Sequence, residues 1–401
     1  MRIGLIAALR RSEEGTLRAE LPLAGRPVLA WQAALLGELG VERVLCLTDT
    51  PTPTGAVLAL QHALEASGTA FHALRGFAAI PALVRAEDDL VILADGLVPD
   101  PQVVRAVLGG GEGALVRAVA TIPADHPLAA AHPEDFERID AARHWAGVLA
   151  MRGAPAQQLA EMPADADAIG LLLRLALQAG TPTRDLAARE LVPESWLLAA
   201  NAAVAAEAGS GLIARAAPPA DWRAPMSALA ARLVRAVVPR GLGEGRLIAG
   251  ASALVLLLAA VLVAAFGPPA AALTLAGLGA FAAEVAAILT ALANRLSRTP
   301  GDRRGAAALA AAVDVLGGLT LWFALAPWPA WQPLAVVGPL VVGLARLVAR
   351  RPHGALARAA SDRASLLLLL AAASLAGLLP EAAACLALGL LAALLLHRAG
   401  D

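Results

Sequence analysis

The chain has 401 residues, of which 58% are hydrophobic and only 16% are charged, a length that allows two or three domains. With a mean hydropathy of +0.66, this composition excludes a wholly soluble protein, because a water-exposed surface needs more charge. The formal net charge of −1 gives no basic excess that would release counterions from phosphates, so nucleic acid is not an expected partner.

The first part of the chain alternates between short apolar runs and helical patterns. The apolar runs at residues 3–8, 43–48 and 90–94 predict strands. The patterns at residues 28–39, 55–67 and 101–108, each of which follows one of these runs, predict helices. This order predicts βαβ units, and therefore a parallel sheet with helices on its faces. A further strand is expected at residues 145–151, followed by helices to about residue 208. Residues 1–8 lack a small-residue cleavage site, so they predict a first strand and a cytoplasmic α/β domain over residues 1–215.

Residues 216–245 are predicted to link this domain to a membrane domain. Within the linker, residues 222–238 place Arg232 and Arg235 among leucines and valines, an amphipathic pattern that suits a membrane surface.

The rest of the chain, residues 246–401, predicts an all-α membrane domain. Six apolar segments of roughly membrane-spanning length follow one another at about 247–266, 270–293, 305–326, 333–349, 364–379 and 381–397. The last two are separated by little more than Pro380, so a tight hairpin is an alternative to two full spans. We therefore expect about six transmembrane helices.

Charge in the connections predicts the orientation of these segments. The second and fourth connections carry arginines, at positions 295, 298, 303 and 304 and at positions 350, 351, 358 and 363, whereas the first and third carry none. The positive-inside rule then places both termini in the cytoplasm and Trp328 and Trp331 in the opposite interfacial belt. All 32 Lys+Arg positions are arginine, a coding bias typical of GC-rich bacteria, so the expected location is a bacterial cytoplasmic membrane.

Residues 5–29, LIAALRRSEEGTLRAELPLAGRPVL, resemble the opening of sugar-phosphate nucleotidylyltransferases, which have a GT-A type, Rossmann-like α/β fold. Positions 22, 23 and 25–28 match the family's Pro-Leu-x-Gly-x-Pro-Leu segment, and the helix and strand that follow also match. The resemblance covers roughly residues 1–200. It implies that Arg18, where the family has a lysine, and Arg26 bind the phosphates of a nucleotide.

Asp95, in the stretch LVILADGL, matches the family's aspartate that holds Mg²⁺ at a strand end. Carboxylate oxygens suit a magnesium ion that bridges protein and phosphates. The alternative is that Asp95 and Gly96 simply form the turn after a buried strand.

The sequence also departs from the nucleotidylyltransferase pattern. The family has glycines in the loop after the first strand so that backbone amides approach the phosphates, whereas here Leu9, Arg10 and Arg11 follow Ala8. The family's second metal aspartate lies near a tryptophan late in the domain. The corresponding stretch, residues 194–208, has Trp196 but no aspartate.

A nucleotidylyltransferase-like domain followed by six membrane helices resembles bifunctional CDP-polyol synthases, whose second half is a CDP-alcohol phosphotransferase. That family uses four aspartates on two helices, because two metal ions neutralise a pyrophosphate while one carboxylate activates the acceptor hydroxyl. The resemblance aligns Glu284 with the first aspartate, Arg295 with the motif's arginine and Asp314 with the third aspartate. Gly318 stands where the fourth would be.

Glu284 lies 11 residues before Arg295, and Asp314 lies 10 residues after Arg304. At about 1.5 Å per residue both are expected roughly 15 Å from the arginine-bearing ends, so the two carboxyl groups could meet. A carboxylate inside a membrane indicates function by default. The alternative is a protonated acid paired with a neighbouring helix.

Two functions are therefore expected. In the first, the protein is an enzyme that activates a polar headgroup phosphate and transfers it to a lipid or polyol acceptor at the cytoplasmic face, with Mg²⁺ at Asp95 and Asp314. In the second, it is a catalytically degenerate relative that serves as a scaffold or binding subunit in lipid or envelope synthesis. Expected partners are a membrane lipid, a nucleotide or nucleotide-activated headgroup, and either a second copy of the chain or an enzyme of envelope synthesis.

Overall fold

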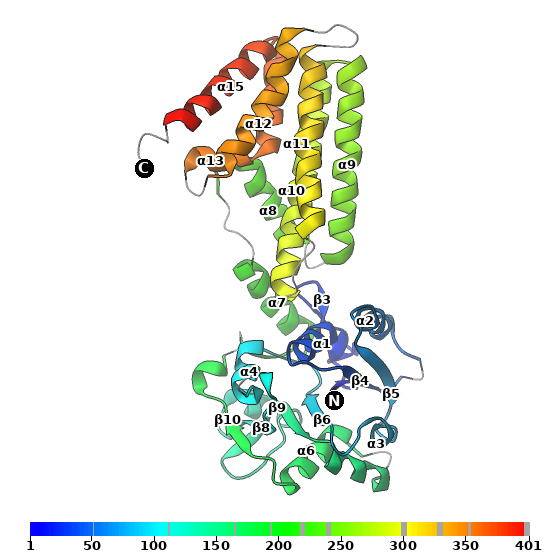
Figure 1. The fold of residues 1–401 in the computed structure, drawn as a ribbon. Coiled ribbons are helices and arrows are strands. Elements are labelled where there is room, and N and C mark those ends of the chain that lie inside the picture. The colour runs from blue at the N-terminus through cyan, green and yellow to red at the C-terminus, as the bar shows by residue number, and fades with distance from the viewer. Residues whose placement is uncertain are drawn as a thin grey trace. The chain divides into compact units, whose positions relative to one another are not determined.

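The computed structural model of the chain (Figure 1) describes residues 1–50, 52–110, 113–163, 166–192, 195–216, 221–237, 242–297, 303–326, 332–351 and 354–396. The chain divides into two compact units, which we call unit 1, Met1–Gly211, and unit 2, Leu212–Asp401.

Unit 1 is built on a seven-stranded sheet with the order β10-β8-β9-β6-β1-β4-β5. Its strands are β1 (Arg2–Ala8), β4 (Arg43–Thr48), β5 (Ala70–Arg75), β6 (Asp89–Leu93), β8 (Ala118–Pro123), β9 (Arg143–Arg152) and β10 (Thr183–Asp185). Every residue of β1 after Arg2 is buried, as expected for a central strand that is covered on both faces.

The sheet is mixed, so the expectation of a parallel sheet is correct only in part. β1 pairs in parallel with β4 and β6, β4 with β5, and β8 with β10. β9 lies antiparallel between β6 and β8. The direction of β9 could not be predicted, because a central strand buried on both faces has the same apolar pattern in either direction.

Unit 1 also contains helices, several of which contact the sheet. They are α1 (Val28–Glu38), α2 (Gly55–Ala66), α3 (Ile80–Leu83), α4 (Pro101–Leu108), α5 (Pro127–Ala131), α6 (Ala168–Gln178) and α7 (Ala202–Ala216), whose end passes into unit 2. The short elements are η1 (Arg18–Glu20), β2 (Pro22–Leu23), β3 (Arg26–Pro27), β7 (Leu97–Pro99), η3 (Ala154–Glu161), η4 (Ala188–Glu190) and β11 (Trp196–Leu198). α1 contacts β1, and a Cβ atom at Gly4 would lie 2.5 Å from Cδ1 of Leu36. Glycine at that position therefore permits the close approach of α1.

Unit 2 is helical. Its helices are α8 (Pro225–Val237), α9 (Leu242–Phe266), α10 (Pro269–Ser297), α11 (Arg303–Leu325), η6 (Pro333–Val336), α12 (Val337–Ala349), α13 (Ala355–Ser361), α14 (Arg363–Leu375) and α15 (Leu379–Leu396). Within the described residues, 3 helices are long and apolar enough to cross a membrane, over Gly245–Phe266, Pro269–Arg295 and Arg304–Leu325. These three pack against one another.

Among the remaining apolar helices, α14 is shorter than the segment that the sequence predicts. α14 has 13 residues, or about 20 Å of helix, against a hydrocarbon core of about 30 Å. It ends at Leu375 because Gly377, with φ +74, turns the chain, and the amides of Gly377 and Leu378 bond back to carbonyls of the last turn. The predicted segment 364–379 therefore runs too far, and the six-span count stays a prediction. Trp328, Trp331 and Arg298 lie outside the described residues.

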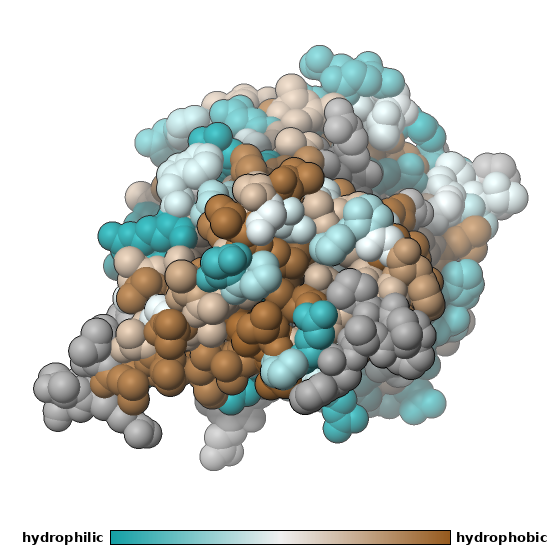
Figure 2. Space-filling model, turned by 90° about the horizontal axis from the view of Figure 1, so that it is seen from above, coloured by the Kyte–Doolittle hydropathy of each residue, from teal (hydrophilic) through white to brown (hydrophobic). Residues whose placement is uncertain are grey.

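Apolar side chains cover much of the surface of unit 2, as Figure 2 shows. On α9 the large exposed ones are Leu247, Ile248, Leu254, Val255, Leu258, Leu262 and Phe266. Large exposed apolar side chains in this number on one helix are typical of helices that face lipid. The amphipathic helix α8 packs against α10 and α14 through Ala228, Ala231 and Val234 and leaves Leu229 and Leu233 exposed.

Candidate functional site

Unit 1 contains a cavity of about 290 Å³ at the carboxyl ends of β1 and β6. These neighbouring strands are parallel, so the residues that follow them meet at one edge of the sheet, where α/β proteins commonly bind ligands. Leu9 and Arg10 follow β1, and Asp95 follows β6 by two residues. The other polar side chains that line the cavity are Glu134, Asp135, Glu137 and Asp167.

Asp95 binds the loop that follows β1. Its Oδ2 atom accepts hydrogen bonds from the backbone N–H groups of Leu9 and Arg10, both at 2.7 Å. Its Oδ1 atom is buried and finds no hydrogen-bond partner among the described residues. Gly96 next to it has φ +77, so the turn expected from the Asp95-Gly96 pair is present.

Burial raises the pKa of Asp95 from 3.8 to about 6, against the hydrogen bonds from Arg10 and Leu9 and the charges of Arg18 and Arg10, which lower it. The carboxyl group is nonetheless ionised at neutral pH.

The two arginines nearest this carboxyl group are already paired. Arg18 donates from one nitrogen to both Asp135 oxygens, at 2.8 and 2.9 Å, and Arg10 lies 2.9 Å from the Oδ1 atom of the same residue. The side chain of Asp135 is only 6% exposed. An internal carboxylate therefore occupies the guanidinium groups that a ligand phosphate would need.

The magnesium ion implied by the resemblance does not fit the residues at Asp95. The amides that would cradle phosphates are bound to Oδ2 of Asp95 itself. In addition, the described part of the chain contains no group of three His, Cys, Asp or Glu side chains placed to share a metal ion. Protein-bound magnesium usually shares one or two carboxylates with ligand phosphates and water, so what does not fit here is the missing cradle for those phosphates.

Arg26, expected to bind phosphate, does not line the cavity of unit 1. Its guanidinium lies 5.4 Å from the ring centroid of Trp31 in a cation–π contact. Burial lowers its pKa.

We expect Asp135→Asn to free Arg10 and Arg18 for anions. CTP should then bind the full-length protein roughly tenfold more tightly, because Arg18 loses its buried counter-ion and Arg10 keeps only the exposed carboxylate of Glu134. The gain should shrink as salt is raised. Isothermal titration calorimetry at several salt concentrations measures the CTP affinity and its dependence on salt.

Asp140→Asn is the matched control for this variant, since Asp140 forms an exposed ion pair with Arg143 and does not line the cavity. Protection of the buried Cys46 thiol from alkylation checks that the variant is folded. Equal CTP affinity in the folded Asp135→Asn variant and the control would refute the assigned role of Asp135.

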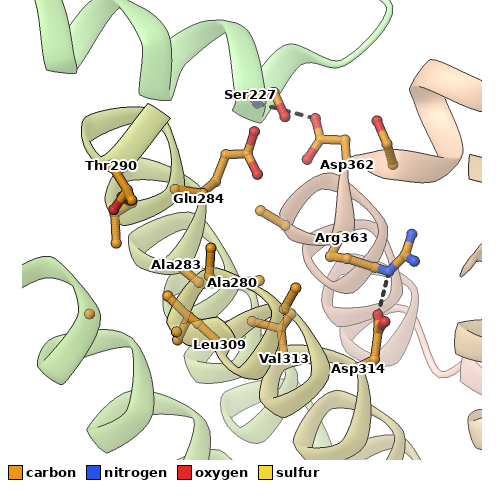
Figure 3. Close-up of a pocket in the computed structure, with 18 of the residues that line it drawn as sticks. Ser227, Ala280, Ala283, Glu284, Thr290, Leu309, Val313, Asp314, Asp362 and Arg363 are labelled. Carbon is orange, nitrogen blue, oxygen red and sulfur yellow. Dashed lines mark hydrogen bonds and ion pairs between the residues drawn. The ribbon is translucent and has the colours of Figure 1, made fainter. Parts of the chain in front are cut away.

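Unit 2 contains a larger cavity of about 410 Å³. It lies toward the beginnings of α9 and α11 and the end of α12, where Arg246, Gly305 and Ala349 line it. Glu284 of α10 and Asp314 of α11 both line this cavity, so the two carboxyl groups that the sequence placed at one depth do lie around one space (Figure 3).

Asp314 is held by arginines from two other helices. Its Oδ2 atom lies 2.9 Å from Nη1 of Arg346 on α12, and its Oδ1 atom lies 2.8 Å from Nε of Arg363 on α14. The side chains of Asp314 and Arg363 are 14% and 15% exposed. Both oxygens are thus occupied by charged donors, which leaves Asp314 poorly suited to bind a metal ion.

Asp362 joins two helix N-termini. It precedes α14 and accepts the N–H of Ser365 at 2.9 Å, which caps that helix. Its other oxygen accepts the N–H of Met226, in the first turn of α8, at 2.9 Å. Asp362 is 2% exposed, and its charge is stabilised by the positive ends of two helix dipoles.

Glu284 has a different environment. Its carboxyl group is hydrogen-bonded by the side chain of Ser227 on α8, and Asp362 lies close enough to interact with it electrostatically. Apart from Asp314, the residues of α11 that line the cavity carry no charge; they are Gly305, Ala306, Leu309, Ala310 and Val313. Arg295, expected to act with Glu284 and Asp314, does not line the cavity and donates to the carbonyl of Ala216 at 2.7 Å.

Several residues in the two cavities or in contact with their lining were not predicted as site residues. Asp362 had a local signal, because an aspartate before an apolar run is a typical helix N-cap. Asp135 and Arg346 had none, since their contacts join residues far apart in the chain. Arg363 was recognised only as a charge in a connection.

A scan against models of known protein families finds no match to this chain, and no curated protein matches it.

Proposed function

We propose that the protein is a membrane-embedded binding subunit of lipid or envelope synthesis, which holds a polar headgroup in the cavity of unit 2 and does not transfer it. It would be a catalytically degenerate relative of the nucleotidylyltransferase and CDP-alcohol phosphotransferase families that its sequence resembles. The expected setting is a bacterial cytoplasmic membrane with both termini in the cytoplasm.

The observation that supports this proposal most is that two arginines bind the carboxylate of Asp314. Two-metal transfer needs several carboxylate oxygens that are free to bind ions, whereas Arg346 and Arg363 occupy both oxygens of Asp314. Many of the other residues that line the cavity are apolar, among them Leu247, Ala283, Leu309 and Val313. An apolar wall beside a few polar groups suits the binding of an amphiphile.

A variant whose larger side chain fills the cavity of unit 2 tests the proposal. Ala310 and Ala308 are both exposed residues of α11, but only Ala310 lines the cavity. We expect the full-length protein purified in mild detergent to retain an amphiphile by native mass spectrometry. Ala310→Phe should reduce this retention roughly tenfold, and Ala308→Phe should leave it unchanged. Equal retention by both variants would contradict the proposal.

The second candidate is the enzyme: a nucleotidylyltransferase and CDP-alcohol phosphotransferase that activates a headgroup phosphate and transfers it to a lipid or polyol. The observation in its favour is the Oδ1 atom of Asp95, buried and without a hydrogen-bond partner among the described residues, in a residue that lines the cavity of unit 1. Release of pyrophosphate from CTP when the wild-type protein is supplied with a polyol phosphate as acceptor, lost in Asp95→Asn, would favour the enzyme over the binding subunit.

A further inference from the structure

The cavity of unit 2 is lined by opposite charges that are not all paired with one another. Arg246 and Arg363 line it together with three carboxylates, those of Glu284, Asp314 and Asp362. Arg346, which is not among the lining residues, contacts Asp314 from α12. With Arg346 included, the formal charges balance, so a neutral or zwitterionic ligand suits the cavity better than a net anion.

Of the three carboxylates that line the cavity, Glu284 is the one whose negative charge has no positive group of the described residues beside it. Asp314 has two arginines and Asp362 has two helix N-termini, whereas Glu284 has the neutral hydroxyl of Ser227 and the like charge of Asp362 nearby. Figure 3 shows Glu284, Ser227 and Asp362 together at one end of the cavity and Arg363 with Asp314 apart from them. An ionised carboxylate at membrane depth is costly without a counter-ion, and a bound cation would supply one.

Arg246 provides the opposite charge at a suitable distance. It lines the cavity, and within the described part of the chain it forms no ion pair. A Cβ atom at the neighbouring Gly245 would lie 3.7 Å from Cδ1 of Leu289, so Arg246 is nearly level with Leu289. Glu284 lies five residues from Leu289 on α10, which is about 7.5 Å along the axis. The long side chains of Arg246 and Glu284 can shorten this separation.

We infer that the cavity binds a zwitterionic phosphoamine, with its ammonium group against Glu284 and its phosphate against Arg246. This inference rests on the proposed binding function and names the class of ligand. A phosphate and an ammonium group joined by two carbons match the two charges. The short apolar linker matches the wall of Leu247, Ala283 and Leu309. The same chemistry occurs in an aminophospholipid headgroup and in a soluble phosphoamine.

Lipid titration of the full-length, delipidated protein in detergent tests the ligand class by native mass spectrometry. We expect phosphatidylethanolamine to bind roughly tenfold more tightly than phosphatidylglycerol with the same acyl chains. Glu284→Gln should abolish this preference, and Glu284→Asp should keep part of it. Arg246→Gln should weaken both lipids. Soluble phosphoethanolamine, titrated in parallel, identifies the source: comparable affinity indicates the free phosphoamine, and much weaker affinity indicates the lipid.

Glu381→Gln is the matched control, because Glu381 also lies in an apolar helix, α15, but does not line the cavity. Equal affinity for the two lipids, or an unchanged preference in Glu284→Gln, would overturn the inference. If lipids bind without an ammonium preference and Ala310→Phe still displaces them, only the ligand class is wrong. If Ala310→Phe displaces nothing, the proposed binding function itself fails.

Discussion

Replacement of Asp95 by asparagine is expected to leave unit 1 at least as stable at pH 7.5 as the wild type, and at most about 3 kcal/mol more stable. That upper bound corresponds to the difference between pKa values of 3.8 and about 6. An asparagine side-chain oxygen can accept the same two N–H groups from Leu9 and Arg10. Its NH₂ group would replace the oxygen that has no partner among the described residues, without an ionised group to bury.

The stability difference between Asp95→Asn and the wild type is expected to change with pH. The pKa of Asp95 is higher in the folded protein than in an unfolded chain, so the folded state holds the proton more tightly. The stability that this proton contributes is fully present below about pH 4 and is lost as the pH rises to about 6. The advantage of Asp95→Asn should therefore be largest at pH 7.5 and vanish near pH 4.

The buried thiol of Cys46 on β4 reports this stability within the full-length protein. Cys385 is exposed, so it is first replaced by alanine. Urea unfolding of unit 1 is then followed by the reaction of Cys46 with a pyridyl disulfide, which reacts across this pH range. Asp95→Ala, which loses both hydrogen bonds, should be destabilised by roughly 2 kcal/mol. A marked loss of stability in Asp95→Asn at pH 7.5 would show that the ionised carboxylate itself is needed.

The sequence located the elements of unit 1 that are apolar and buried. The runs at 3–8, 43–48 and 90–94 correspond to β1, β4 and β6 within one or two residues. β5 was missed because its residues alternate irregularly between buried and partly exposed positions at the edge of the sheet. Strand order and direction depend on tertiary pairing, for which hydrophobic periodicity has no signal.

The candidate sites show the same division. The position of Asp95 at the end of a strand was predicted from the sequence, and Asp95 does lie at the edge of the sheet. The equal depth of Glu284 and Asp314 along their helices was also predicted, and both residues line one cavity. The partners of these residues decide their chemistry, and these partners could not be predicted. Asp135 reaches Arg18 from 117 positions away, and Arg363 reaches Asp314 from 49 positions away. Such ion pairs depend on side-chain packing that a single sequence does not reveal.

Asp314→Ala is expected to destabilise unit 2 by roughly 3 kcal/mol. The main cause is Arg363, whose side chain is only 15% exposed, because removing one partner of a buried ion pair leaves the other charge uncompensated. Arg346 is 44% exposed and keeps most of its hydration, so Arg346→Met alone should cost less than about 1 kcal/mol. Unfolding of the full-length protein in mixed micelles by sodium dodecyl sulfate, followed by far-ultraviolet circular dichroism, measures these differences.

The double variant Asp314→Ala/Arg363→Met distinguishes a structural ion pair from a carboxylate needed for chemistry. Replacing both members of a buried pair with apolar groups is often neutral, so the second substitution should restore most of the lost stability. The double variant should also retain the amphiphile bound by the wild type, because Glu284 and Arg246 are intact. A loss below about 1 kcal/mol in Asp314→Ala, or no recovery in the double variant, would mean that this ion pair does not hold α11 to α14. Asp314 would then be free to act as the resemblance to the phosphotransferases suggests.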